Sequence, residues 1–185
     1  LIERPEMSVW KLLITSKGMP RRQSRWCCEL IKEHSGSGRR VITGIRWQES
    51  PRRAKRRMVE VCRTDETKLF VTPIIDWTED DVWEFIKVEK IPYCDLYDET
   101  YWNPRKRKEV RRFKRLGCVL CPMETAAQTK FELTRFPKTA EAWKRACYLF
   151  WERQTEGVAR WKTAEDMWQW WLSRNGEPKV NNAQC

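Results

Sequence analysis

The sequence of 185 residues predicts an α/β fold, in which a layer of strands and helices is followed by a helical C-terminal part. Three observations predict it: two short β-branched runs alternate with helical patterns, a well-capped helix start follows the second run, and apolar residues recur at helical spacing from residue 126 onward. From these patterns we expect an α/β portion over residues 1–125, a helical extension over 126–175 and a flexible tail over 176–185.

Two short helices are expected before the first strand. In segment 8–17, Val9, Leu12 and Leu13 share one helical face, and Gly18 with Pro20 ends the run. Ser24 can cap a second helix that continues to Glu33. Residues 41–45 form a short apolar run bounded by arginine pairs and turn residues, which predicts a buried strand.

The middle of the chain continues the alternation. Pro51 is expected at the first position of a helix that ends near Cys62. Residues 69–75 predict a second buried strand, and Thr78 predicts the capped, acidic start of another helix. Residues 91–125 are expected to be loop.

Charge narrows the classes of partner. The 37 Lys and Arg residues exceed the 26 Asp and Glu residues by eleven, and a domain this basic favours anionic partners such as nucleotides or nucleic acid. The basic segment Arg105–Arg115 makes nucleic acid a candidate partner. No apolar stretch is long enough to span a membrane and no signal peptide is visible, so we expect a cytoplasmic protein. Because the sequence begins at Leu1, we expect an N-terminally truncated piece of a longer protein.

Four of the eight cysteines form two pairs that suit metal ligation. Cys118 and Cys121 make a C-x₂-C turn, and Cys27 and Cys28 are adjacent. Neighbouring thiolates suit the spaced irons of a four-iron cluster better than one zinc ion, so we favour iron–sulfur over zinc; buried thiols without metal remain an alternative. A helix N-terminus with Arg25 and Arg115 nearby is expected to lower the pKa of these thiols.

Five segments resemble, in order, motifs of the phosphoadenylylsulfate (PAPS) and adenylylsulfate (APS) reductase family, within the adenine-nucleotide α-hydrolase-like superfamily. They are Pro20–Lys32 (P-x-x-x-x-R-W-C-C-x-x-x-K), Gly44–Ala54 (G-I-R-x-x-E-S-x-x-R-A), Pro73–Trp83 (P-I-x-D-W-x-x-x-D-V-W), Ile91–Glu99 and Arg115–Met123 around the C-x₂-C turn.

The resemblance implies a partial Rossmann-like layer and a specific site. In members that carry a cluster, the two cysteine pairs together hold a [4Fe–4S] cluster, and the corresponding positions are Cys27, Cys28, Cys118 and Cys121. The G-I-R-x-x-E-S-x-x-R loop binds the phosphate and sulfate end of the substrate, which would fall on Arg46, Ser50 and Arg53. The implied partners are an adenine nucleotide (PAPS, APS or ATP) and a redox protein such as thioredoxin.

Three departures keep other functions open. The family's Gly-rich pyrophosphate loop is absent, Cys185 lacks the Gly and His of the family's nucleophile segment, and the basic insertion Pro104–Lys114 is additional. We therefore expect an enzyme that resembles a PAPS reductase and assign no catalytic residue. The alternatives are a sulfur-transfer enzyme acting on nucleic acid, of the DNA phosphorothioation or tRNA thiolation type, and a zinc-stabilised basic module that binds nucleic acid without catalysis.

Overall fold

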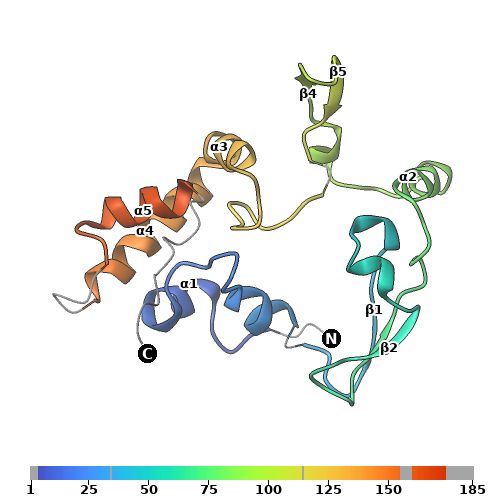
Figure 1. Ribbon diagram of the computed structural model, residues 1–185, viewed down its shortest axis with the longest axis horizontal. Coiled ribbons are helices and arrows are strands. Elements are labelled where there is room, and N and C mark those ends of the chain that lie inside the picture. Colours follow the sequence, from blue (N-terminus) through green and yellow to red (C-terminus); the bar gives the residue numbers. More distant parts are fainter. Residues whose placement is uncertain (1–3, 34, 114, 155–159, 174–185) are drawn as a thin grey trace, which may run out of the picture. The chain divides into compact units, whose positions relative to one another are not determined.

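The computed structural model describes residues 4–33, 35–113, 115–154 and 160–173, so the tail expected over 176–185 lies outside the described part (Figure 1). The chain divides into two compact units, one made of Leu1–Glu33 and Gly117–Cys185, the other of His34–Leu116. The boundary that we expected at residue 125 separates an α/β sequence pattern from a helical one. The division into compact units does not test this boundary, which stays a prediction. Helices and small sheets together confirm the α/β class. None of the helices in the described ranges is long and apolar enough to cross a membrane.

The first unit begins with the predicted short helix. Helix α1 (Val9–Leu12) is capped by the Ser8 hydroxyl, which accepts a hydrogen bond from Lys11 N at 3.2 Å, and continues as a π-helical turn over Leu13–Lys17. It ends at Gly18, where φ is +64° and a Cβ would lie 2.7 Å from the Phe150 ring. Glycine is therefore required here both by its backbone angle and by space.

The remaining helices of this unit follow the predictions. A π-helical turn spans Cys28–Glu33, and the C-terminal part consists of α3 (Ala126–Arg135), α4 (Pro137–Glu152) and α5 (Ala164–Ser173). Helix α4 has Pro at its first position, where no amide donor is needed. Thr163 and Asp166 cap the start of α5 reciprocally, as Thr163 N donates to the Asp166 carboxylate and Asp166 N to the Thr163 hydroxyl.

A tryptophan-rich core holds the first unit together. Figure 1 shows α4 and α5 side by side, and the Trp171 ring of α5 stacks on Trp143 of α4 at 5.2 Å between ring centres. The indole N–H of Trp171 donates to Pro20 O at 2.8 Å, which fastens the segment before the first cysteine pair to the last described helix. The core comprises Leu12, Leu13, Met19, Trp26, Leu120, Ala140, Trp143, Ala146, Cys147, Met167, Trp168 and Trp171.

The second unit contains a small mixed sheet. Its strands are β1 (Arg40–Ile42), β2 (Val59–Val61) and β3 (Leu69–Val71), in the order β1-β3-β2, with β1 parallel and β2 antiparallel to β3. Both predicted strands therefore exist, in shorter form. The predicted burial of the first strand is wrong, because among the described strands β1 pairs with β3 alone and the Ile42 side chain is 76% exposed.

The helix predicted after Pro51 is also wrong. Trp47–Glu49 and Arg53–Lys55 are single 3₁₀ turns, and the chain then enters β2, so that Cys62 follows a strand. Five basic residues between positions 52 and 57 would repel one another at helical spacing, and the β-branched residues of β2 favour an extended chain.

The rest of the second unit is more regular than expected. Helix α2 (Glu79–Val88) has the predicted cap, in which Thr78 and Asp81 exchange side-chain-to-backbone hydrogen bonds. The predicted loop over 91–125 instead contains a helical turn, Asp95–Asp98, and a hairpin of β4 (Thr100–Asn103) and β5 (Lys108–Arg111). Figure 1 shows the hairpin standing at the end of that helical turn.

Candidate metal centre and anion-binding loop

The two cysteine pairs lie in the same compact unit although they are about ninety positions apart in the chain. Cys27 and Cys28 stand at the start of the π-helical turn, where Cys28 N donates to Arg25 O at 2.9 Å. Cys118 and Cys121 flank a tight turn in which Cys121 N donates to Cys118 O at 3.1 Å. All four are free thiols, and only Cys118 is fully exposed.

Arg22 ties the two cysteine-bearing segments together. Its guanidinium donates to Pro122 O at 3.2 Å, Met123 O at 3.0 Å and Glu124 O at 3.2 Å. A planar fork of donors suits several carbonyl acceptors at once. Arg22 therefore fixes the C-x₂-C turn against the segment that leads into Cys27.

The C-x₂-C turn is anchored from inside the unit as well. Leu120 is fully buried with φ at +60°, a conformation that costs a non-glycine residue about 1–2 kcal/mol. Its amide donates to the buried Glu132 carboxylate at 2.6 Å, and Gln128 of the same helix also donates to Glu132, at 3.1 Å. Burial of the leucine side chain and this charge-assisted bond offset the unfavourable backbone angle.

The thiols influence one another's ionisation. Burial, followed by the neighbouring sulfurs of Cys28 and Cys121, raises the pKa of Cys27 to about 11. Burial likewise raises the pKa of Cys121, with added repulsion from Cys118 and Cys28. The predicted lowering of the thiol pKa values is therefore wrong for Cys27 and Cys121, because desolvation and like charge outweigh any nearby arginine. These causes also show that sulfurs of both pairs lie within electrostatic range of each other.

The residue types of the two pairs suit a thiolate-held centre. Burial and neighbouring sulfurs make the ionisation of Cys27 and Cys121 unfavourable, and a bound metal centre would reverse that balance. The indole N–H of Trp26, which precedes Cys27, is buried without an acceptor among the described residues, and sulfur of a bound cluster could accept it. Within the described ranges, no three Cys, His, Asp or Glu side chains already stand at spacings that would hold a metal ion.

The second unit carries the predicted anion-binding residues in one loop. The Glu49 carboxylate forms ion pairs with Arg46, at 3.8 Å, and with Arg53. The Ser50 hydroxyl accepts a hydrogen bond from Arg53 N at 3.2 Å, and Trp47 N donates to Ile75 O at 2.7 Å, which holds the loop beside the end of β3. The three residues therefore share one short, internally bonded loop.

Two features make this loop suitable for an anion. The Arg46 Nη1 atom is buried with no hydrogen-bond partner among the described residues, which leaves a charged donor to be satisfied. Burial lowers the pKa of Arg53, and the nearby positive charges of Arg115 and Arg56 lower it further. The helix predicted after Pro51 contributes no N-terminus to this site, since Arg53–Lys55 is a single 3₁₀ turn.

Sequence reasoning missed three residues that shape these sites. Glu49 occupies the acidic position of the quoted loop motif, so the motif could have drawn notice to it. Arg22 stands at an unspecified position of the Pro20–Lys32 motif and Glu132 lies outside the motifs. Their roles depend on contacts across about a hundred and about twelve residues respectively. No local pattern reports such contacts.

Comparison with known proteins agrees with these features. The family model described as the phosphoadenosine phosphosulfate reductase domain matches residues 2–124. An uncharacterized protein of Methanocaldococcus jannaschii is 28% identical over 163 residues, which is 83% of this chain and 31% of that protein. An adenosine 5'-phosphosulfate reductase of Shouchella clausii is 31% identical over 108 residues, 58% of this chain and 38% of its own length. A phosphoadenosine 5'-phosphosulfate reductase of Xanthomonas campestris is 34% identical over 83 residues, 39% of this chain and 33% of its own length.

Each match covers a larger share of this chain than of the relative. The chain spans about a third of the length of these curated relatives. No solved structure gives a significant match. The family model nevertheless covers well over half of the chain, including both cysteine pairs and the arginine loop. The chain therefore belongs to the phosphoadenosine phosphosulfate reductase family.

Proposed function

We propose that this chain is part of an enzyme resembling a sulfonucleotide reductase, in which Cys27, Cys28, Cys118 and Cys121 hold a [4Fe–4S] cluster. Arg46, Ser50 and Arg53 would bind the phosphate and sulfate end of an adenine nucleotide such as APS or PAPS. A thiol-reducing protein such as thioredoxin would be the redox partner. The named reductases among the relatives support the substrate class.

One observation carries the proposal. Two thiol pairs from distant parts of the sequence lie in one unit. The Cys121 sulfur helps to raise the pKa of Cys27, and the Cys28 sulfur helps to raise the pKa of Cys121. Four thiolates complete the ligand set of a four-iron cluster, and adjacent cysteines suit its separate irons.

The side chains of this chain define their own tasks in such a reaction. A bound cluster would supply a rigid link between the two cysteine-bearing segments. Arg46 and Arg53 would neutralise phosphate and sulfate oxygens through forked hydrogen bonds, exchanging Glu49 for the anion. The Ser50 hydroxyl, whose oxygen accepts from Arg53 N, keeps its own proton to donate.

The experiment is a pair of cysteine substitutions in protein purified without oxygen. Cys118→Ser is expected to remove the absorbance near about 400 nm and to lower iron and sulfide to a small fraction of wild type, because it removes one of four ligands. Cys147→Ser is the matched control: Cys147 is completely buried in the helical core and is not one of the proposed ligands, so this variant should leave the iron content per folded molecule unchanged.

The outcomes distinguish three interpretations of the four cysteines: ligands of an iron–sulfur cluster, ligands of zinc, or thiols without metal. Equal iron loss in both variants, or colourless wild-type protein with stoichiometric zinc, would contradict the cluster assignment. Zinc would support the alternative of a zinc-stabilised module. Wild-type protein that binds neither metal after anaerobic reconstitution would leave four ordinary thiols.

A second candidate function is sulfur transfer to nucleic acid. One observation favours it, namely the basic hairpin of β4 and β5, which an enzyme acting only on a small nucleotide does not require. Label from a ³⁵S donor recovered in nucleic acid, in place of free sulfite, would distinguish this candidate from the reductase.

A further inference from the structure

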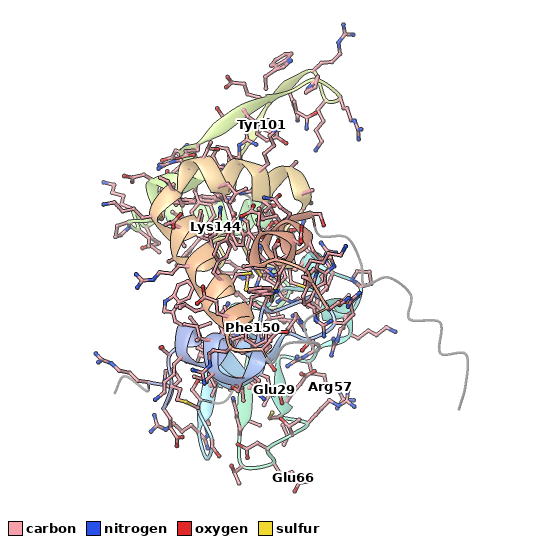
Figure 2. The ribbon with its side chains drawn as sticks, turned by 90° about the vertical axis from the view of Figure 1, so that its left-hand side faces the viewer. Glu29, Arg57, Glu66, Tyr101, Lys144 and Phe150 are labelled. Carbon is pink, nitrogen blue, oxygen red and sulfur yellow. The ribbon has the colours of Figure 1, made fainter. Side chains whose placement is uncertain are left out.

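The hairpin formed by β4 and β5 concentrates positive charge. Residues 100–112 carry six basic side chains and one acidic side chain, Glu109, which gives a net charge of +5 (6 − 1) within thirteen positions. Figure 2 shows nitrogen-bearing side chains spreading from the far end of this hairpin, with Tyr101 labelled on the strand behind them. This density of charge exceeds what the fold of a two-stranded hairpin needs.

The tip of the hairpin has a defined backbone. The side-chain oxygen of Asn103 accepts hydrogen bonds from Arg105 N at 3.0 Å and Lys106 N at 3.1 Å, and Arg107 adopts φ of +51°. Asn at the start of such a turn is a common turn former. The side chains of residues 105–108 are exposed, and none of them forms an ion pair with any residue that the structure describes. Four cations therefore project from a fixed turn.

The two faces of the hairpin differ. Tyr101 pairs with Val110 on one face, and both are half-buried. Trp102 pairs with Glu109 on the other face, where the Trp102 side chain is 61% exposed. The Thr100 hydroxyl donates to the Glu109 carboxylate at 3.5 Å. A large indole is thus presented outward, one residue pair from the tip.

The two arginines at the base of the hairpin have another role. The Arg111 guanidinium lies 3.9 Å from the ring centre of Trp83 in α2, and that of Arg112 lies 3.9 Å from the ring centre of Tyr101. Such stacking orders a guanidinium on an aromatic face. The Arg111 contact holds the hairpin to α2, the Arg112 contact braces the hairpin internally, and the tip cations are left for an external partner.

We propose that the hairpin of residues 100–112 binds a single-stranded segment of nucleic acid, with the cations of 105–108 on phosphates and Trp102 stacked on an unpaired base. Proteins that bind single strands combine aromatic side chains with rows of cations, because every base offers a face for stacking and every phosphate linkage carries a negative charge. A duplex offers no unpaired base to Trp102. An anionic membrane would be met by apolar side chains at the tip, but the tip sequence is Pro-Arg-Lys-Arg-Lys and the indole lies behind it.

The inference concerns binding only and goes beyond the proposed cluster function. The hairpin and the cysteine pairs belong to different units. Cys118→Ser should therefore abolish the cluster without changing the affinity for nucleic acid. Loss of one property without the other distinguishes failure of this inference from failure of the proposed function.

The test is fluorescence anisotropy of the full chain with labelled single strands of about 15 nucleotides, oligo-U RNA and oligo-dT DNA, between about 50 and 200 mM salt. The double substitution Arg105→Gln with Lys106→Gln is expected to weaken binding roughly tenfold and to reduce the slope of log affinity against log salt by about 1.4. Trp102→Ala should weaken binding roughly tenfold, and Trp102→Phe should retain most of the affinity.

A matched control removes the same charge elsewhere. Lys130→Gln with Lys138→Gln changes two exposed lysines of α3 and α4 and should leave the affinity within about twofold of wild type.

An equal loss of affinity in this control would mean general charge attraction and would overturn the proposal. Unchanged binding in the hairpin variants would overturn it as well. The proposal would also be overturned if these residues were needed for binding to phosphatidylserine vesicles but not for binding to single strands. A duplex that binds as tightly as the single strand would overturn it too. Preference between RNA and DNA identifies the source of the strand.

Discussion

In the unit that carries the cysteine pairs, twelve buried side chains form one continuous core, four of them tryptophans. In the unit that carries the arginine loop, Ile75 and Phe113 are the large apolar side chains that are buried among the described residues, while Ile42 and Val88 are 76% and 66% exposed. The difference indicates a division of tasks: the thiols lie on a frame with a large apolar core, and the anion loop lies in a part whose stability rests on fewer buried apolar side chains. Binding loops are commonly drawn from such low-stability regions.

The largest expected effect tests that contrast directly. Trp171→Ala removes an indole that stacks on Trp143 and Trp168 and donates to Pro20 O, and should lower the free energy of unfolding by about 3–5 kcal/mol. Ile42→Ala in β1 should lower it by less than about 0.5 kcal/mol, because that side chain is already in solvent. Urea unfolding followed by circular dichroism measures both. Similar losses in the two variants would remove the distinction between the units.

An intermediate effect is expected from the arginine that joins the cysteine segments. Arg22→Ala removes three hydrogen bonds to the carbonyls of residues 122–124 and should cost about 1–2 kcal/mol of unfolding free energy. It should also lower the iron retained after anaerobic purification, since the C-x₂-C turn loses its link to the segment before Cys27.

The control for this prediction is Lys130→Ala, which removes an exposed cation from α3 without touching either cysteine segment. Its stability and iron content should match those of wild type. If Arg22→Ala retains full iron with unchanged stability, the cysteine segments are positioned by the core alone.

The smallest effect concerns a surface network between α4 and α5. Hydrogen bonds from Gln169, Tyr148 and Lys144 lower the pKa of Glu165 from 4.5 to about 2. Figure 2 labels Lys144 on α4. A carboxylate whose pKa is lowered on folding stabilises the protein above its unfolded pKa, and this contribution is lost as the pH falls through the folded pKa. Because Glu165 is 45% exposed, the contribution at neutral pH is below about 1 kcal/mol.

Glu165→Gln should therefore lower the melting temperature slightly at pH 7, and the difference from wild type should shrink as the pH falls from 4.5 toward 2. Glu141→Gln, an exposed carboxylate elsewhere on α4, makes the same change of charge outside this network. A difference that is constant with pH would show that Glu165 acts through packing instead of through its charge.

The sequence predicted the parts of the fold that depend on local chemistry. Thr78 and Thr163 begin α2 and α5 because a hydroxyl acceptor and an acidic third residue satisfy the first amides of a helix, a pattern visible in a few residues. The hairpin at 100–112 was missed because its strands, Thr-Tyr-Trp-Asn and Lys-Glu-Val-Arg, show no regular alternation of apolar and polar residues and lie in a segment dominated by charge. Asn103-Pro104 marked the turn between them.

The candidate site was predictable in its residues and not in its surroundings. The family motifs named the cysteines and the arginine loop, but the raised pKa of Cys27 arises from burial by helices far along the chain. The helix expected after Pro51 failed because repulsion among neighbouring cations and the strand preference of Val59–Val61 outweighed one favourable start residue.

The hydrogen bond from Trp171 to Pro20 spans 151 positions of the chain, and it joins the approach to the first cysteine pair with the last described helix. During synthesis on a ribosome, the first pair emerges long before the residues that hold it in place have been translated. The arrangement of the first cysteine pair is therefore completed only after α5 has left the exit tunnel, and loading of the proposed cluster would follow the folding of the helical unit.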